Sequence, residues 1–357
     1  MDKIRLGIIG MGNIGKYHAE YLLNRKINRC ELVAVCDANV APLEQFKPLK
    51  IFGDGGQLIQ SGAVDAVIIA TPHFQHTTLG IAAHKKHPEI IFAGMFQLRT
   101  EPRYLKIQKL IKEDLGQIVR VNWINTDWFR TEAYYASSGW RATWKGEGGG
   151  VLLNQCLHNL DTLQWLCGMP ARVRGFCQIG RFHQIEVEDN VTVYLEWANG
   201  ATGTFISSTG ETPGTNRFEI VGTRGTLVLE NNKLSLTRNE ADMLEFSKTA
   251  KQGFVKPGSR TEEIAFENAA APHATMVQNF VNAILDGAPL IAPGEEGINS
   301  VELANVMIYS SLLGQTMELP MDGAAWEKKL NQLIAESKIE KKVVKVATDD
   351  FASSFRK

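Results

Sequence analysis

The chain has 357 residues, of which 44% are hydrophobic and 22% are charged, and its formal net charge is −1. This length accommodates two packed cores, and the composition is ordinary for a soluble globular protein. A net charge so close to zero gives no electrostatic attraction to nucleic acid or to an anionic membrane, and no apolar run approaches the ~20 residues of a membrane helix, so we expect no nucleic-acid partner and no membrane partner.

The N-terminus and the cysteines indicate the compartment. Residues 1–5 lead directly into a strand pattern and show no signal-peptide architecture. The five cysteines contain no C-x-x-C pair, and their odd number is typical of reduced thiols. We therefore predict a cytoplasmic protein.

The first 116 residues alternate short apolar strands with helical stretches. Strands are predicted at 4–10, 31–36 and 64–70, and a helix at about 14–25 follows the first of them. Strands that alternate with helices imply right-handed crossovers and a parallel sheet. We therefore predict an α/β fold over 1–116, a Rossmann domain with a doubly wound parallel sheet.

The pattern changes after residue 116, where strands follow one another with few helices between them. The predicted strands are 118–125, 173–179, 190–197, 201–207, 218–221 and 226–229, and helices are predicted at 276–286 and 300–313. Apolar and polar residues alternate along 190–197, and this alternation with the Asn199-Gly200 turn after it is typical of an antiparallel hairpin. We predict an α+β substrate and oligomerisation domain over 117–323, followed by a charged tail over 324–357.

A glycine-rich turn, G-x-G-x-x-G, lies between the first strand and the first helix. Gly10 permits the tight turn, Gly12 lets the backbone approach a pyrophosphate, and Gly15 allows close packing of helix on strand. Asp37 ends the next strand, where its carboxylate can accept hydrogen bonds from ribose hydroxyls and repel a 2′-phosphate. This context favours a dinucleotide site over a merely structural turn, and NAD over NADP as the dinucleotide. The predicted cofactor contacts are Gly10, Gly12, Asn13, Ile14, Gly15 and Asp37.

Two further motifs resemble those of the Gfo/Idh/MocA oxidoreductases. Residues 70–76, A-T-P-H-F-Q-H, resemble the family's A-T-P-N-x-x-H segment. Trp140-Arg141 and the stretch 148–161, G-G-G-V-L-L-N-Q-C-L-H-N-L-D, resemble its W-R, G-G-G and D/N-x-x-x-H-x-x-D pattern. Residues 273–287, 300–311 and 319–320 are similar to its closing segment, so the resemblance covers nearly the whole chain up to about residue 323.

The resemblance implies an NAD(P)-dependent dehydrogenase or reductase of sugars, inositols or related polyols. It implies an open, mostly antiparallel C-terminal sheet with helices on one face, through which a homodimer or homotetramer would form. It also adds candidate cofactor contacts at Thr71, Pro72, His73, His76, Trp140 and Arg141.

Asn154, His158 and Asp161 are spaced i, i+4, i+7, so we expect them on one face of a helix. Removing a hydride from a secondary alcohol requires an acceptor for the hydroxyl proton, and histidine, with an ordinary pKa near ~6.5, suits that role. Spacing alone favours a polar helix face with a satisfied histidine. The resemblance favours His158 as acid/base or hydroxyl ligand and Asn154 as substrate ligand.

Other candidate substrate contacts are Asp161, Gln97, Arg99 and Trp144. Gln97 and Arg99 follow an expected strand at 90–96, where ligands bind in such sheets. Trp144 offers an apolar face to a sugar, with core packing as the alternative, and Arg141 could meet a phosphate or the nicotinamide end. We predict no metal site, because the spacing of the histidines and carboxylates matches no ligand pattern.

The family's E-K-P triplet, whose lysine transfers the proton in its members, does not occur in this chain. Residues 84–94 resemble the end of the following helix and the next strand, so one βα unit of ~30 residues is missing near 79–86. A chain break, a deletion and an adapted protein are the competing explanations. Losing an interior strand should cost more than the ~5–15 kcal/mol stability of a domain, which favours a break. Lys85 and Lys86, at a helix end before Pro88, are poor substitutes.

These patterns predict an NAD-dependent oxidoreductase that moves a hydride between nicotinamide and a hydroxyl or keto carbon of a sugar or polyol. A lysine outside these residues would be the main proton carrier. Two alternatives stay open. One is an NAD-dependent glycoside hydrolase that acts by transient oxidation, and the other is a non-catalytic NAD-binding regulator.

Overall fold

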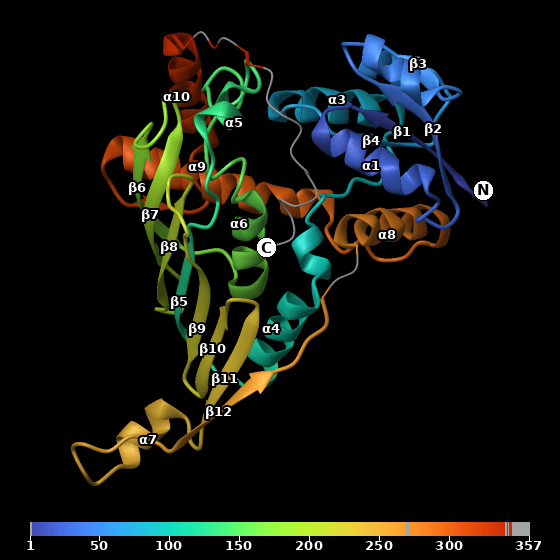
Figure 1. Cartoon of the computed structure of the whole chain (residues 1–357). Coiled ribbons are helices and arrows are strands. Elements are labelled where there is room, and N and C mark those ends of the chain that lie inside the picture. Colours follow the sequence, from blue (N-terminus) through green and yellow to red (C-terminus); the bar gives the residue numbers. More distant parts are fainter. Residues whose placement is uncertain (1, 269–270, 340, 342, 345–357) are drawn as a thin grey trace. The chain divides into compact units, whose positions relative to one another are not determined.

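The computed structural model describes residues 2–268, 271–339, 341 and 343–344, and they form two compact units (Figure 1). The first unit comprises the residues up to Gln97 together with Ala271–Glu295. The second unit comprises Leu98–Ala270 and Glu296–Val344. The second unit therefore begins before the predicted boundary at 116, because α4 (Pro102–Glu113) packs against α6 (Leu157–Cys167). The boundaries at 116 and 323 stay predictions.

The first unit contains a parallel sheet whose described strands have the order β3-β2-β1-β4. The strands are β1 (Ile4–Ile9), β2 (Cys30–Cys36), β3 (Lys50–Phe52) and β4 (Ala66–Ile69). Apolar residues of β1 pack against α1 (Asn13–Leu23) and against α8 (Pro272–Asp286), which returns from late in the chain. The helices α2 (Gly55–Gln60) and α3 (His73–Lys86) complete the unit. The predicted parallel sheet is confirmed.

The position of the missing βα unit is continuous in this chain. Helix α3 runs unbroken from His73 to Lys86, so the expected break between 79 and 86 is wrong. The expected strand at 90–96 is also wrong, because this stretch makes only an isolated bridge between Ala93 and Pro293. The sheet ends at β4, whose four residues are all half-buried. The first unit is thus a Rossmann-type sheet that lacks a strand beyond β4 in the described residues.

The second unit contains a mixed, mostly antiparallel sheet of nine described strands in the order β12-β11-β10-β9-β5-β8-β7-β6-β13. The only parallel pairing among them joins β5 (Ile118–Asn125) to β8 (Thr202–Ser208). The other strands are β6 (Arg172–Ile179), β7 (Glu188–Glu196), β9 (Asn216–Gly222), β10 (Gly225–Glu230), β11 (Lys233–Asn239), β12 (Ser259–Ile264) and β13 (Met317–Glu318). The predicted antiparallel second sheet is confirmed.

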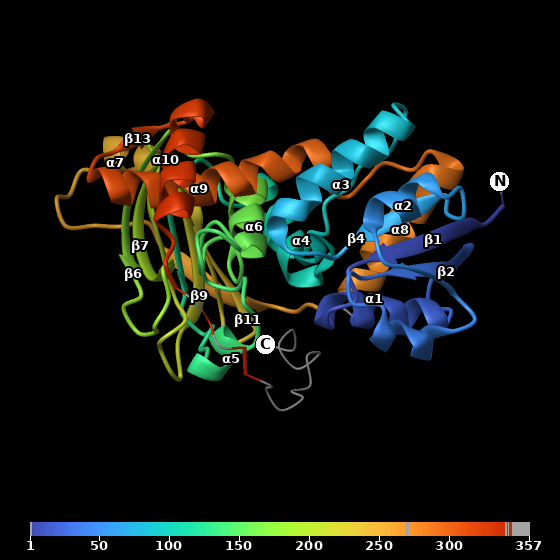
Figure 2. The ribbon, with the colours of Figure 1, turned by 90° about the horizontal axis from the view of Figure 1, so that it is seen from above.

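Helices α4, α6 and α9 (Gly297–Leu313) lie on one face of this sheet (Figure 2). Buried side chains of these helices and of the facing strands form one continuous core. The shorter helices are α5 (Glu132–Ala136) and α7 (Met243–Thr249), and α10 (Gly323–Glu336) follows the last strand. Gly287 and Gly314 end α8 and α9 in the left-handed conformation that glycine adopts most easily. Among the described residues, no helix has the length and apolar character that a bilayer crossing requires.

Candidate functional site

The glycine-rich turn of the first unit has the backbone geometry that its sequence predicts. Gly10 has φ +95°, and a Cβ built there would lie 2.6 Å from the carbonyl oxygen of Ala70. A Cβ on Gly15 would lie 1.9 Å from the carbonyl oxygen of Gly10. A Cβ on Gly12 would meet nothing within 4 Å. Two of the glycines are therefore needed by the turn itself, and Gly12 leaves open space above it.

The N-terminus of α1 opens next to this space. The helix begins at Asn13, and its N-cap, Gly12, has no side chain to cap the first amides. No acidic residue lies in the first turn, so the N–H groups of Asn13, Ile14 and Gly15 and the positive end of the helix dipole stay available to an anion. A pyrophosphate fits this arrangement.

Asp37 follows β2 and lies at the same turn. Its Oδ2 accepts a hydrogen bond from the N–H of Met11 at 2.8 Å, and its Oδ1 accepts one from the N–H of Asn39 at 3.0 Å. A carboxylate has about four acceptor positions, so capacity remains for ribose hydroxyls. The bond to Met11 shows that Asp37 also holds the glycine-rich turn, a role that its spacing in the sequence did not suggest.

The A-T-P-H segment follows β4 and borders the turn. The Thr71 hydroxyl is buried and has no hydrogen-bond partner within the described part of the chain. The Thr71 carbonyl accepts a hydrogen bond from His76 at 2.7 Å, and Pro72 is the N-cap of α3. The rings of His73 and His76 meet edge to face with centroids 6.2 Å apart. A buried hydroxyl without a partner beside the glycine-rich turn is a suitable donor for a bound dinucleotide.

Asn154 and His158 lie in the second unit, but they do not share a helix. Helix α6 begins at Leu157, so Asn154 belongs to the turn before it, and the predicted common helix face is wrong for this residue. His158 is half-buried, and burial lowers its pKa from 6.5 to about 4. A pKa this low makes the imidazole a weak base, which favours a hydrogen-bonding role over that of the main proton acceptor.

Tyr134 connects the polar residues around Asn154. Its hydroxyl accepts hydrogen bonds from Arg141 Nη1 at 2.6 Å and Gln155 Nε2 at 3.0 Å, and donates to Asn154 Oδ1 at 3.3 Å. The Asn154 amide donates to Glu147. Sequence reasoning missed Tyr134 and Glu147, because neither occurs in a spaced motif, and it passed over Gln155 inside the motif that carries Asn154.

The triple-glycine turn before Asn154 packs against β7. A Cβ on Gly150 would lie 2.0 Å from the carbonyl oxygen of Glu188. The Glu188 Oε1 accepts hydrogen bonds from the N–H groups of Gly150 at 2.8 Å and Leu152 at 3.1 Å. Complete burial raises the pKa of Glu188 to about 7, and its Oε2 has no partner among the described residues. Glu188 therefore holds the turn that presents Asn154.

Trp140 and Arg141 join the cluster around Tyr134. The Arg141 guanidinium lies 4.4 Å from the ring centroid of Tyr134 and 4.7 Å from that of Trp140. Trp144, by contrast, is 6% exposed and lies in the hydrophobic core of the second unit, where the core-packing alternative would put it.

Arg99 and Asp161 bind each other. Arg99 Nε and Nη2 donate to the two carboxylate oxygens of Asp161 at 2.8 and 2.7 Å, and their side chains are 1% and 0% exposed. Arg99 also pairs with Glu296. Gln97, at the start of a 3-10 turn, is buried as well. Burial and this pairing engage both side chains within the second unit, and their predicted contact with a substrate stays a prediction.

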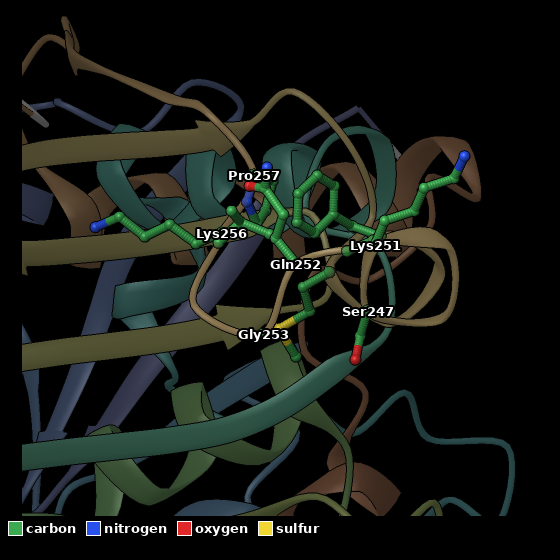
Figure 3. Close-up of a pocket in the computed structure, with 10 residues that line it drawn as sticks. Ser247, Lys251, Gln252, Gly253, Lys256 and Pro257 are labelled. Atoms are coloured by element: carbon green, nitrogen blue, oxygen red, sulfur yellow. The ribbon is translucent and has the colours of Figure 1, made fainter.

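A shallow hollow lies elsewhere in the second unit, between α7 and the chain that leads to β12 (Figure 3). None of the residues predicted from the sequence lines it; Lys251, Gln252 and Lys256 do. Figure 1 places α7 at the β11–β12 end of the sheet, whereas α5 and α10 lie at the β6 end. In the described ranges, no group of three His, Cys, Asp or Glu side chains could hold a metal ion.

The sequence matches two protein-family models. Residues 4–92 match "Oxidoreductase family, NAD-binding Rossmann fold", and residues 108–319 match "Oxidoreductase family, C-terminal alpha/beta domain". The chain is 24% identical to the inositol 2-dehydrogenase of Rhizobium meliloti over 346 residues, which cover 86% of this chain and 96% of that protein. It is 24% identical to the myo-inositol 2-dehydrogenase of Thermotoga maritima, covering 82% and 92%.

Solved structures share the fold. The WlbA dehydrogenase of Bordetella pertussis, in complex with NADH and UDP-GlcNAcA, superposes with a TM-score of 0.72 at 24% identity, covering 90% of this chain and 100% of that one. A levoglucosan dehydrogenase in complex with NADH and L-sorbose gives a TM-score of 0.72 at 18% identity, with the same coverage.

Proposed function

Because this chain belongs to the Gfo/Idh/MocA family of oxidoreductases, we propose that it is an NAD(H)-dependent dehydrogenase or reductase of a sugar or polyol. The observation that carries the proposal is the cradle of the first unit. Open space above Gly12, the uncapped N-terminus of α1 and the Asp37 carboxylate lie at one turn. Together they fit the pyrophosphate and the adenosine ribose of a dinucleotide.

Asp37 determines the choice of cofactor in this proposal. Its carboxylate would accept hydrogen bonds from the ribose hydroxyls of NAD and repel the 2′-phosphate of NADP. Thr71, Pro72, His73 and His76 would border the same ligand from the end of β4. The bound nicotinamide would supply the chemistry, which is acceptance or donation of a hydride at its ring.

Residues of the second unit would hold the substrate. Asn154 can both donate to and accept from a sugar hydroxyl, and the neutral His158 would orient the hydroxyl at the reacting carbon. Inositol, UDP-GlcNAcA and L-sorbose are named for relatives of this chain, and all carry several hydroxyl groups. We propose a polyhydroxylated substrate of this kind.

The exposed face of the second sheet would form the homodimer or homotetramer. Phe176 on β6 pairs with Thr192 on β7, and both lie on the face opposite to the buried Val191 and Val193. Phe176 is 54% exposed and Tyr194 is 39% exposed on this face. We also propose a cytoplasmic location, since the cysteines are free thiols.

A non-catalytic NAD-binding regulator is the second candidate. The chain has no E-K-P triplet, and the low pKa of His158 leaves the cluster without a strong base at that position. Both observations would suit a protein that binds the cofactor but does not turn over.

Single-turnover absorbance at the NADH band separates these functions. Protein in excess is mixed with NAD⁺ and myo-inositol, D-glucuronate or D-glucose. A dehydrogenase gives one NADH per consumed substrate, and a regulator binds NAD⁺ without any absorbance change. A glycoside hydrolase that oxidises transiently releases its sugar with no net NADH.

A further inference from the structure

We propose that the substrate carries an anionic group, a carboxylate or a phosphate, which Arg141 and Arg130 of the second unit bind. This inference deepens the proposed function, on which it rests, by naming the chemical class of the sugar. It starts from two arginines that form no ion pair with any described residue and from buried donors that find no acceptor among those residues.

Arg141 has a donor that no residue in the described ranges satisfies. Its Nη1 donates to the Tyr134 hydroxyl at 2.6 Å, but its Nε is buried and has no hydrogen-bond partner among the described residues. It forms no salt bridge there either, although Arg99 in the same unit pairs with two carboxylates. A buried N–H without an acceptor is costly, so such a group indicates a missing partner.

Arg130 lies against the same tyrosine. Its guanidinium is 5.1 Å from the ring centroid of Tyr134 and 5.5 Å from that of Trp128. Its Nη1 donates to the carbonyl oxygens of Phe129 at 2.9 Å and Trp128 at 3.4 Å, and the described residues provide it with no carboxylate. Two guanidinium groups that contact one ring without an ion-pair partner form a positively charged site.

The segment between the two arginines adds a second unsatisfied donor. The Ser138 hydroxyl is buried and has no partner in the part of the chain that the structure describes. Lys341, which lies far from this segment in the sequence, holds it in place. Its Nζ donates to the carbonyl oxygens of Tyr135 at 3.1 Å and of Arg141. The lysine brings a further positive charge close to Arg141.

The carboxylates near the segment are engaged with amide donors. Glu147 accepts from the Ala142 N–H at 2.6 Å and from the Asn154 amide. Glu132 accepts from the N–H of Gln184 at 3.1 Å, and Asp127 accepts from the side chains of Asn125 and Asn216. Within the described part of the chain, none of them forms a salt bridge with either arginine, so we infer that a ligand supplies the anion.

The planar guanidinium matches a carboxylate or a phosphate through paired hydrogen bonds. A uronic acid and a sugar phosphate both offer this chemistry, while the remaining sugar hydroxyls would meet Tyr134 and Asn154, which are already bonded to each other. The anion differs from the cofactor pyrophosphate, for which the first unit has its own amide cradle.

The test is isothermal titration calorimetry of the full chain, which measures its affinity for D-glucuronate, D-glucose 6-phosphate and D-glucose. Each titration is run with and without saturating NADH. We expect at least one anionic probe to bind about 10- to 100-fold more tightly than D-glucose, as expected for one charge-assisted pair. The better of the two anionic probes then identifies the source of the anion. The preference should weaken as salt is added.

Arg141→Met should remove most of this preference, and its NADH affinity, measured in parallel, tests the cofactor contact that the family resemblance implied for Arg141. Arg141→Lys keeps the positive charge but loses the paired N–H donors of the guanidinium, so it should retain part of the preference for the anion. It serves as the second variant if the methionine variant fails to fold. Arg181→Met is the matched control, because Arg181 also lies over an aromatic ring, 5.9 Å from that of Phe182, and should change nothing.

Equal affinity for D-glucose and both anions, or no binding of either anion, would overturn the inference even if NADH binds normally. A loss of NADH affinity in Arg141→Met would assign the arginine to the cofactor and overturn it as well. Failure of the wild-type protein to bind NADH would instead count against the proposed function, while the titrations without NADH would still test the anion.

Discussion

The two candidate sites of this chain hold their ligands by different means. The turn in the first unit offers backbone amides and open space, and the charged side chain beside it, Asp37, also holds the turn by accepting a hydrogen bond from the Met11 N–H. The cluster in the second unit is built from side chains, with Tyr134 between Arg141 and Asn154. A site of backbone amides should be sensitive to an added methyl group, whereas a site of side chains should be sensitive to the loss of one charge or one hydroxyl.

The largest expected effect is on stability, and it should differ between Arg99 and Arg141 of the second unit. Arg99→Met removes the partner of the fully buried Asp161, so we expect the free energy of unfolding to fall by about 3–5 kcal/mol. Arg141→Met breaks no ion pair with a described residue and should cost far less stability. Denaturant titration of both variants measures the difference. Similar losses in the two variants would remove the distinction between a structural arginine and a ligand-binding one.

Glu188 tests how firmly the turn before Asn154 is held. Its folded-state pKa of about 7 lies above the ordinary 4.5, so folding takes up a proton and stability falls as pH rises from about 4.5 to 7. Glu188→Gln keeps an acceptor for Gly150 and Leu152 without the charge. We expect it to stabilise the protein above pH 7 by up to about 3 kcal/mol and to have no such effect below pH 4.5. Thermal unfolding across this range should show the difference between variant and wild-type protein develop between about pH 4.5 and pH 7, and a constant difference at every pH would contradict the assignment.

Gly12→Ala tests the cradle in the first unit. The new methyl group meets nothing within 4 Å in the protein, so the melting temperature should stay unchanged. The methyl would occupy the place of the pyrophosphate, and we expect NADH affinity to fall by about 100-fold, or about 2.7 kcal/mol. Nicotinamide fluorescence measures the affinity. Gly253→Ala is the control, because a Cβ there also meets nothing within 4 Å. Unchanged NADH affinity in Gly12→Ala would show that the open space is not the binding site.

The two sites also differ in how far the sequence predicts them. The cradle is local: three glycines within six residues and one aspartate at the next strand end determine it, so the motif specifies its geometry. The cluster depends on contacts between distant residues. Tyr134 reaches Asn154 across 20 positions, and no periodic pattern joins them. Asp161 shares the motif of Asn154 but is buried, because it pairs with Arg99, a residue 62 positions away that no local pattern connects to it.

The fold shows the same division. Alternating strands and helices predicted the parallel sheet, and the antiparallel sheet followed from strand patterns and turns. The missing βα unit was visible in the sequence, but its consequence was not. The cost of a lost strand suggested a chain break, whereas the chain continues through α3, and β4 is the last strand of the sheet among the described residues.

The smallest expected effect concerns cofactor choice. Asp37→Ala removes the ribose acceptor and the charge that repels a 2′-phosphate, so the preference for NADH over NADPH should fall by about 10-fold. The lost bond to Met11 should loosen the turn and weaken both cofactors alike. Parallel titrations with NADH and NADPH separate the two effects. Equal affinity for both cofactors in the wild-type protein would refute the role of Asp37.

The most direct test of the proposed function is a titration of the wild-type protein with NADH, followed by nicotinamide fluorescence and by calorimetry. The cradle at Gly12, Asp37 and the N-terminus of α1 predicts saturable binding of one NADH per chain. It also predicts a higher melting temperature at saturation, because a ligand that binds only the folded state stabilises it. No saturable binding, with a correctly folded protein, would contradict the assignment of this chain as an NAD(H)-dependent oxidoreductase.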